Sequence, residues 1–226
     1  MKSLNTNGFY RFLEWLMWIM YLNLLWIISS LLGLIVFGIF PATMALISTI
    51  REWHVNEEIS FHKSYAKAYK QYFIKSNLMG FLFLVVGYIL FVDLQWIIQN
   101  TSTFQFLFLT VFIVLAFIYI ITLLYTFPIM AHFNLKISHA IKHAIIIGVF
   151  SPLVTFIMGT ILILLQYLWR FIPGLLPVIG VSLTFYIITR FSIIAFERFE
   201  VKQKKLLEKE NNPIMKGGTR TCIRFI

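Results

Sequence analysis

The chain has 226 residues, of which 60% are hydrophobic, 18% aromatic and only 12% charged. Soluble domains carry about 25% charged residues, so this composition excludes a water-soluble globular domain and predicts a membrane protein. The formal net charge of +10 does not indicate a nucleic-acid partner, because the basic residues lie between apolar runs and in the C-terminal tail. The single cysteine, Cys222, excludes an internal disulfide.

The first apolar run, residues 15–50, contains no charged side chain. It is too long for the core of a signal peptide. One straight helix of this length would measure about 54 Å, against a hydrocarbon core of about 30 Å. A helix-break motif of Gly33, Gly38 and Pro41 therefore predicts that the run bends.

Two arrangements of this run remain open. In one, short spans at 15–32 and 34–50 form a hairpin; in the other, a single span ending near Phe40 is followed by an interfacial helix at 41–53. The hairpin keeps the N-terminal basic residues in the cytoplasm, so that all but one of the 19 Lys and Arg residues lie inside. We therefore predict six hydrophobic segments with both termini cytoplasmic, and five spans as the alternative.

The next stretch, residues 56–77, is polar and predicts an amphipathic helix at 60–76 on the cytoplasmic face. One face carries the aromatic residues Phe61, Tyr65, Tyr69, Tyr72 and Phe73, and the opposite face carries Lys63, Lys67 and Lys70. Rings towards lipid and ammonium groups towards anionic head groups are typical of an interfacial helix, which makes the lipid bilayer the first partner. The alternative is a helix whose rings pack on its own protein.

The rest of the chain predicts four further segments and a tail. We place the segments at 77–99, 104–127, 144–168 with a kink at Ser151-Pro152, and 172–196. Residues 1–200 then form a single transmembrane domain, and residues 201–226 form a charged cytoplasmic tail. The predicted fold class is all-α, a polytopic transmembrane helix bundle with five to six hydrophobic segments and a cytoplasmic amphipathic helix.

Two charged residues, Asp93 and Arg190, lie inside predicted spans, where an ionisable side chain is a functional hypothesis. Their predicted depths differ by about 15 Å, so we do not expect them to pair. Arg190 is predicted to reach the inner interface or to meet Glu197 or Glu14. His139 and His143 have the spacing of two zinc ligands but no nearby acid or cysteine. We predict no catalytic, cofactor or metal site, and a protein that is not an enzyme.

The most specific stretch is residues 38–46, GIFPATMAL, followed by Arg51-Glu52-Trp53, the aromatic helix and Lys75-Ser76-Asn77. These residues resemble the YesL-like family of bacterial integral membrane proteins, and the resemblance extends from about Phe9 to Lys209. Members are mostly uncharacterised and tend to be encoded beside carbohydrate importers of the ATP-binding-cassette (ABC) type. The resemblance implies a bacterial cytoplasmic membrane protein with a role near sugar uptake, and the final GGTRTCIRFI departs from the family pattern.

Two functions follow from these observations. The first is a non-enzymatic accessory component of an ABC-type carbohydrate importer, with the permease subunits as partners; the chain has no phosphate-binding glycine loop of its own. The alternative is an independent small transporter or channel. That alternative needs polar residues along a path, and the spans offer only a few at different depths: Asn23, Asp93, Gln95, Gln166 and Arg190.

Overall fold

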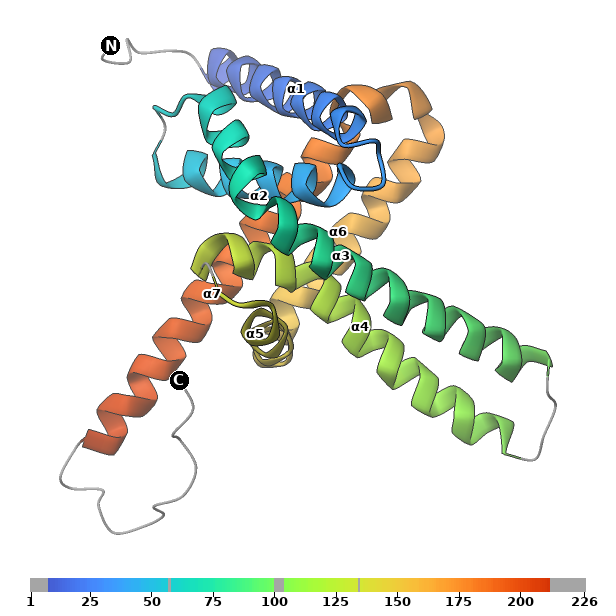
Figure 1. Ribbon diagram of the computed structural model, residues 1–226. Coiled ribbons are helices and arrows are strands. Elements are labelled where there is room, and N and C mark those ends of the chain that lie inside the picture. Colours follow the sequence, from blue (N-terminus) through green and yellow to red (C-terminus); the bar gives the residue numbers. More distant parts are fainter. Residues whose placement is uncertain (1–7, 57, 100–103, 134, 212–226) are drawn as a thin grey trace.

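A computed structural model of the chain describes residues 8–56, 58–99, 104–133 and 135–211, with side chains up to residue 204 (Figure 1). This part of the chain is helical and contains no strand, so the predicted all-α helix bundle is confirmed. In chain order the elements are α1 (Gly8–Leu32), α2 (Ile39–Val55), α3 (Phe61–Gln99), α4 (Gln105–Phe133), α5 (Ile137–Phe150), α6 (Pro152–Phe171), the 3-10 turn η1 (Pro173–Leu175), the π-helical turn η2 (Leu176–Gly180) and α7 (Val181–Asn211).

Five helical stretches in the described residues are long and apolar enough to cross a membrane: α1, α3, α4, α6 and residues 173–204. The segment predicted at 34–50 is instead α2, which has 17 residues and is about 26 Å long, shorter than the hydrocarbon core. Residues 41–47 of α2 are all buried, because α1, α3, α4 and α7 pack around it. The predicted turn joins α1 to α2, but α2 is a buried core helix that is not among the five candidate spans.

The break between α1 and α2 lies where the glycines predict it. A Cβ on Gly33 would overlap the backbone of Gly38, so the turn closes only with a glycine there. The residues in the left-handed region are Leu34 and Ile35, with φ angles of 56° and 62°. Pro41 does not break the helix. It lies in the first turn of α2, where a missing N–H costs nothing because that N–H has no helical acceptor.

The amphipathic stretch and the segment predicted at 77–99 are one continuous helix, α3, of 39 residues. Its first half packs against α2 through the most extensive contact in the protein. Its second half leaves the body beside α4, and together they form a two-helix arm (Figure 1). Apolar side chains on this arm are exposed, among them Phe106 (83%). We expect a bilayer to cover them.

The predicted kink at Ser151-Pro152 is a complete break between α5 and α6. Ser151 has φ −121° and ψ 55°, its amide donates to the Ile147 carbonyl, and Pro152 begins the next helix. Proline is favourable at that first position because its ring fixes a helical φ. The last predicted segment, 172–196, likewise starts irregularly, since the regular α7 begins only after η1 and η2.

Candidate functional site

The aromatic face of α3 turns towards the protein. Phe61, Tyr65 and Tyr72 are 4%, 4% and 6% exposed, so the prediction that these rings face lipid is wrong. Phe61 stacks on Trp18 with ring centroids 3.9 Å apart and meets the edge of Trp53 at 5.3 Å. The alternative, a helix packed on its own protein, describes these three residues.

Hydrogen bonds explain why the tyrosines prefer the interior. The Tyr65 hydroxyl lies 2.7 Å from Ser29 Oγ of α1 and donates to the Ala42 carbonyl of α2 at 3.1 Å. Tyr69, which is half-buried, donates to the Ser29 carbonyl at 3.2 Å. Phe73 is exposed and contacts the Tyr69 ring. The hydroxyls of Tyr65 and Tyr69 therefore tie α3 to the α1–α2 hairpin, and both have hydrogen-bond partners there.

The opposite face of α3 is free. Lys63, Lys67 and Lys70 are all exposed, and we call this set the lysine face. These residues are three or four positions apart, so their side chains lie on neighbouring turns of one helix surface. This face gives the body a concentrated positive surface between residues 63 and 70.

A hollow of about 300 Å³ adjoins the lysine face, between the end of α2, the first half of α3 and the end of α4. We call it the Arg51 hollow. It is lined by Ser48, Arg51, Glu52, Val55, Ser64, Lys67, Ala68, Gln71, Tyr72 and Ala131. Lys67 belongs both to the lysine face and to this lining, so the two form one continuous surface.

Polar atoms in the Arg51 hollow have unused hydrogen-bonding capacity. One terminal nitrogen of Arg51 donates to the Ala131 carbonyl at 2.8 Å. Arg51 Nε and Ser48 Oγ are buried and have no partner among the described residues. A buried donor without a partner costs about 1–3 kcal/mol, more for a charged group. A carboxylate or other acceptor from a ligand or partner protein would satisfy these donors, since guanidinium binds carboxylate in a matching planar geometry.

The two intramembrane charges lie apart. Asp93 is exposed on the distal arm, and Arg190 is half-buried in α7 with its guanidinium against both ring nitrogens of His54. Among the described residues, no ion pair joins Asp93 to Arg190. Arg190 contacts His54 instead of the expected partners Glu197 and Glu14. Desolvation is the main cause that lowers the pKa of His54, Arg190 adds to it, and Glu197 opposes it. No sequence pattern links residues 136 positions apart.

The sequence singled out Asn23 only as a polar residue inside a span, and its structural role was not predicted. It is 1% exposed on α1, and its side chain donates to the Pro177 carbonyl at 2.6 Å and accepts from the Ser182 amide at 3.0 Å. These are backbone groups that the irregular entry to α7 leaves without helical partners. An asparagine in the apolar middle of α1, together with a proline-interrupted run before α7, was the available signal. Asn23 therefore clamps the broken end of α7 to α1.

The lysine face and the Arg51 hollow offer positive charge and hydrogen-bond donors for binding. Among the described residues, no three His, Cys, Asp or Glu side chains lie together in a way that could hold a metal ion. The helical architecture and its five candidate spans define a multi-pass membrane protein whose polar features are a cationic surface and buried hydrogen-bond clamps.

Comparison with known proteins identifies the family. The family model described as "Protein of unknown function, DUF624" matches residues 19–94, which contain α2, the aromatic face and most of the Arg51 hollow. YteU of Bacillus subtilis (strain 168) is 34% identical over 177 residues, 78% of this chain and 79% of that protein. YesL of the same strain is 31% identical over 200 residues, 88% of this chain and 94% of that protein. The chain belongs to this YesL-like, DUF624 family. Both relatives are described as uncharacterized, and no solved structure matches the chain.

Proposed function

We propose that the chain is a non-enzymatic accessory component of an ABC-type carbohydrate importer in the bacterial cytoplasmic membrane. The observation that carries the proposal is the lysine face running into the Arg51 hollow, where Arg51 Nε and Ser48 Oγ lack partners. This surface fits an acidic segment of a permease subunit. The family resemblance implies an importer as the partner. The unpartnered donors of the Arg51 hollow imply that an acidic segment of that partner docks there.

The charge pattern supports a cytoplasmic position for this surface. Lys63, Lys67 and Lys70 are exposed at the start of a helix whose later half is apolar, and basic residues flanking spans face the cytoplasm by the positive-inside rule. An acidic partner would gain association rate from the lysines and specificity from the Arg51 hollow. Both termini are cytoplasmic in this proposal.

Co-purification with a tagged permease tests the docking surface. We expect Lys63→Gln/Lys67→Gln/Lys70→Gln to reduce recovery of the complex, and Arg51→Gln to reduce it further because the hollow loses its bidentate donor. The matched control is Lys75→Gln/Lys136→Gln/Lys142→Gln, which removes three exposed lysines outside both surfaces. Equal recovery of the parent, the triple variant and Arg51→Gln would contradict the proposal.

One observation favours the alternative of an independent transporter or channel. The α7 entry is a discontinuous helix held by Asn23, and Ser30, Ser182 and Ser192 are buried with hydroxyls that have no partner among the described residues. Broken helices with unpaired polar groups form substrate sites in many transporters. Purified protein in liposomes distinguishes the two functions, because sugar entry without any ATPase, abolished by Asn23→Ala, would support the alternative.

A further inference from the structure

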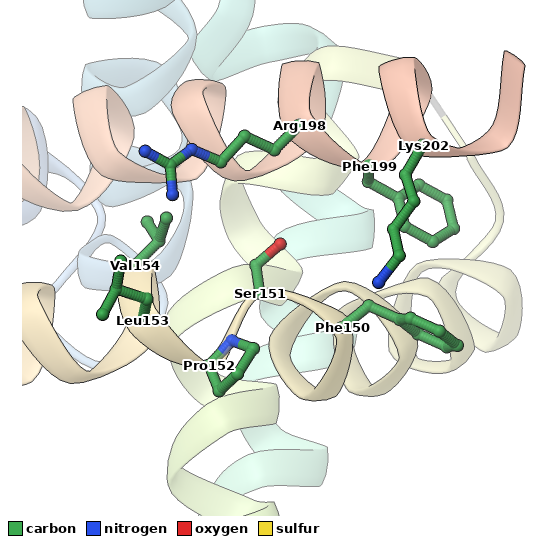
Figure 2. Close-up of a pocket in the computed structure, with 8 residues that line it drawn as sticks. All are labelled: Phe150, Ser151, Pro152, Leu153, Val154, Arg198, Phe199 and Lys202. Atoms are coloured by element: carbon green, nitrogen blue, oxygen red, sulfur yellow. The ribbon is translucent and has the colours of Figure 1, made fainter. Parts of the chain in front are cut away.

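A second cavity, of about 140 Å³, lies where the break between α5 and α6 faces α7 (Figure 2). It is separate from the Arg51 hollow and shares no residue with it. Its polar lining consists of Ser151, Arg198 and Lys202, and its walls are apolar, with Phe150, Pro152 and Phe199 among them. The lining set contains two cations and no carboxylate.

Ser151 is a buried residue whose hydroxyl lines this cavity. The residue is 7% exposed, and Figure 2 shows its oxygen directed from the helix break towards α7. Only the backbone of Ser151 is engaged, since its amide donates to Ile147 and its carbonyl accepts from Thr155. The side chain does not cap α6, and its Oγ makes no hydrogen bond within the part of the chain that the structure describes. A hydroxyl that lines the cavity without a hydrogen-bond partner among the described residues is available to a ligand.

Two basic side chains flank that hydroxyl. Arg198 and Lys202 are four residues apart on α7, so they project from the same helix face, one on each side of Ser151 (Figure 2). Lys202 Nζ lies 5.4 Å from the centroid of the Phe150 ring, which holds the ammonium group at the cavity edge. The neighbouring acids Glu197 and Glu200 act on His132 of α4 and do not line the cavity.

The start of α6 adds backbone donors. Pro152 occupies the first helical position and has no N–H, and Leu153 and Val154 follow in the first turn. The first amides of an α-helix have no intrahelical acceptor, and the helix dipole makes that end positive. A hydroxyl, two cations and the first turn of α6 therefore line one small cavity, and hydroxyl, guanidinium, ammonium and amide groups are donors that phosphate oxygens accept from.

We propose that this cavity binds an anionic phosphate group, with Ser151, Arg198 and Lys202 as its side-chain ligands. The phosphate can belong to a phospholipid head group or to a soluble phosphate ester. The surroundings suit the lipid, because Phe150 (55%) and Leu153 (63%), which line the cavity, are exposed apolar side chains. Acyl chains would cover these side chains while the head group occupied the cavity.

Full-length protein in detergent tests the proposal, with bound molecules counted by native mass spectrometry. The probes are phosphatidylglycerol, phosphatidylcholine and glycerol 3-phosphate. At about 1 kcal/mol per basic residue, Arg198→Gln/Lys202→Gln should weaken phosphatidylglycerol binding roughly thirtyfold. Ser151→Ala should weaken it several-fold without unfolding the helix break, because the hydroxyl makes no cap hydrogen bond. The control is Arg170→Gln/Lys204→Gln, an exposed Arg and Lys outside the lining.

The outcomes separate the two sources of phosphate. Tight binding of phosphatidylglycerol by the parent and the control variant, lost in the double variant, supports a lipid head group. Binding of glycerol 3-phosphate that the double variant also loses supports a soluble phosphate ester. Equal binding of every probe by the parent and the double variant, or binding of none by the parent, overturns the proposal. Native charge-state distributions of the variants confirm that they remain folded.

Discussion

At the scale of single residues, Tyr65 shows how a hydroxyl decides which way an amphipathic helix faces. Its ring is 4% exposed, and its OH contacts both Ser29 Oγ and the Ala42 carbonyl, so one side chain joins α3 to α1 and α2. Hydrogen bonds between helices of membrane proteins contribute about 0.6–2 kcal/mol. Acceptors for Tyr65 and Tyr69, and ring packing for Phe61, both lie inside the protein.

Tyr65→Phe keeps the buried ring and removes only the hydroxyl. We expect it to lower the stability of the purified protein by about 1–2 kcal/mol, since the Ala42 carbonyl and Ser29 lose a partner. Thermal unfolding in detergent measures the change. Tyr88→Phe is the matched control because Tyr88 is 68% exposed on the distal arm. If both variants have the melting temperature of the parent, the Tyr65 hydrogen bonds to α1 and α2 do not stabilise the protein.

His54 makes a pH-dependent contribution through its contact with Arg190. Burial and Arg190 together hold the pKa of His54 below its ordinary value of 6.5, against the opposing Glu197. Between this lowered pKa and about pH 6.5, the histidine therefore binds more protons in the unfolded chain than in the folded protein. The stability contribution is complete above about pH 6.5 and is lost as the pH falls below it.

We therefore expect the melting temperature of the parent to fall, relative to that of His54→Gln, when the pH decreases from about 8 to about 5.5. Arg190→Gln should reduce this difference without removing it, since desolvation is the larger cause. Thermal unfolding across this range, in one detergent and at constant ionic strength, measures it. Parallel pH profiles for the parent and His54→Gln would show that the Arg190 contact does not act on the histidine charge.

At the scale of elements, the sequence predicted the helices more reliably than their surroundings. The sequence predicts the breaks at 33–38 and at Ser151-Pro152. Glycine widens the allowed φ range and proline removes an N–H donor at its own position, so these effects are local. The sequence does not show whether the aromatic face packs on protein or on lipid, because both environments are apolar. The burial of α2 and the unpartnered Arg51 Nε depend on helices distant in sequence, so no local pattern reports them.

The packing of α2 on α3 depends on a close approach at Gly80. A Cβ on Gly80 would overlap Cγ of Phe40, so the Phe40 ring must change its rotamer or the two helices must move apart. Gly80→Ala should therefore destabilise the protein by about 1–3 kcal/mol, although alanine is the better helix former. Gly159→Ala is the matched control, because a Cβ at Gly159 meets nothing within 4 Å and should be neutral or slightly stabilising. Thermal unfolding in detergent compares the two variants. Equal melting temperatures would show that the contact between α2 and α3 accommodates a methyl group at position 80.

At the scale of the whole molecule, the protein divides into a body and an arm. The body encloses α2 and carries the Arg51 hollow, and the arm consists of the second half of α3 and the first half of α4 (Figure 1). The family match, residues 19–94, covers the part of the body that holds the aromatic face and runs into the arm. The family model thus matches the region where α1, α2 and α3 meet.

The arrangement of the body makes the position of the N-terminus a decisive measurement. If α1 and α2 enter and leave the membrane together, both termini are cytoplasmic; if α1 alone crosses, the N-terminus is outside. Cysteine labelling in Cys222→Ser protein with a membrane-impermeant thiol reagent on whole cells separates these topologies. We expect Phe171→Cys to react and Ala66→Cys and Ser138→Cys to remain unlabelled, because positive-inside topology places the α3 lysines and the start of α5 in the cytoplasm. An unlabelled cysteine at position 3 supports the hairpin. Labelling there from outside replaces it with five crossings and moves Lys2 and Arg11 to the outer face, while the lysine face and the Arg51 hollow stay inside.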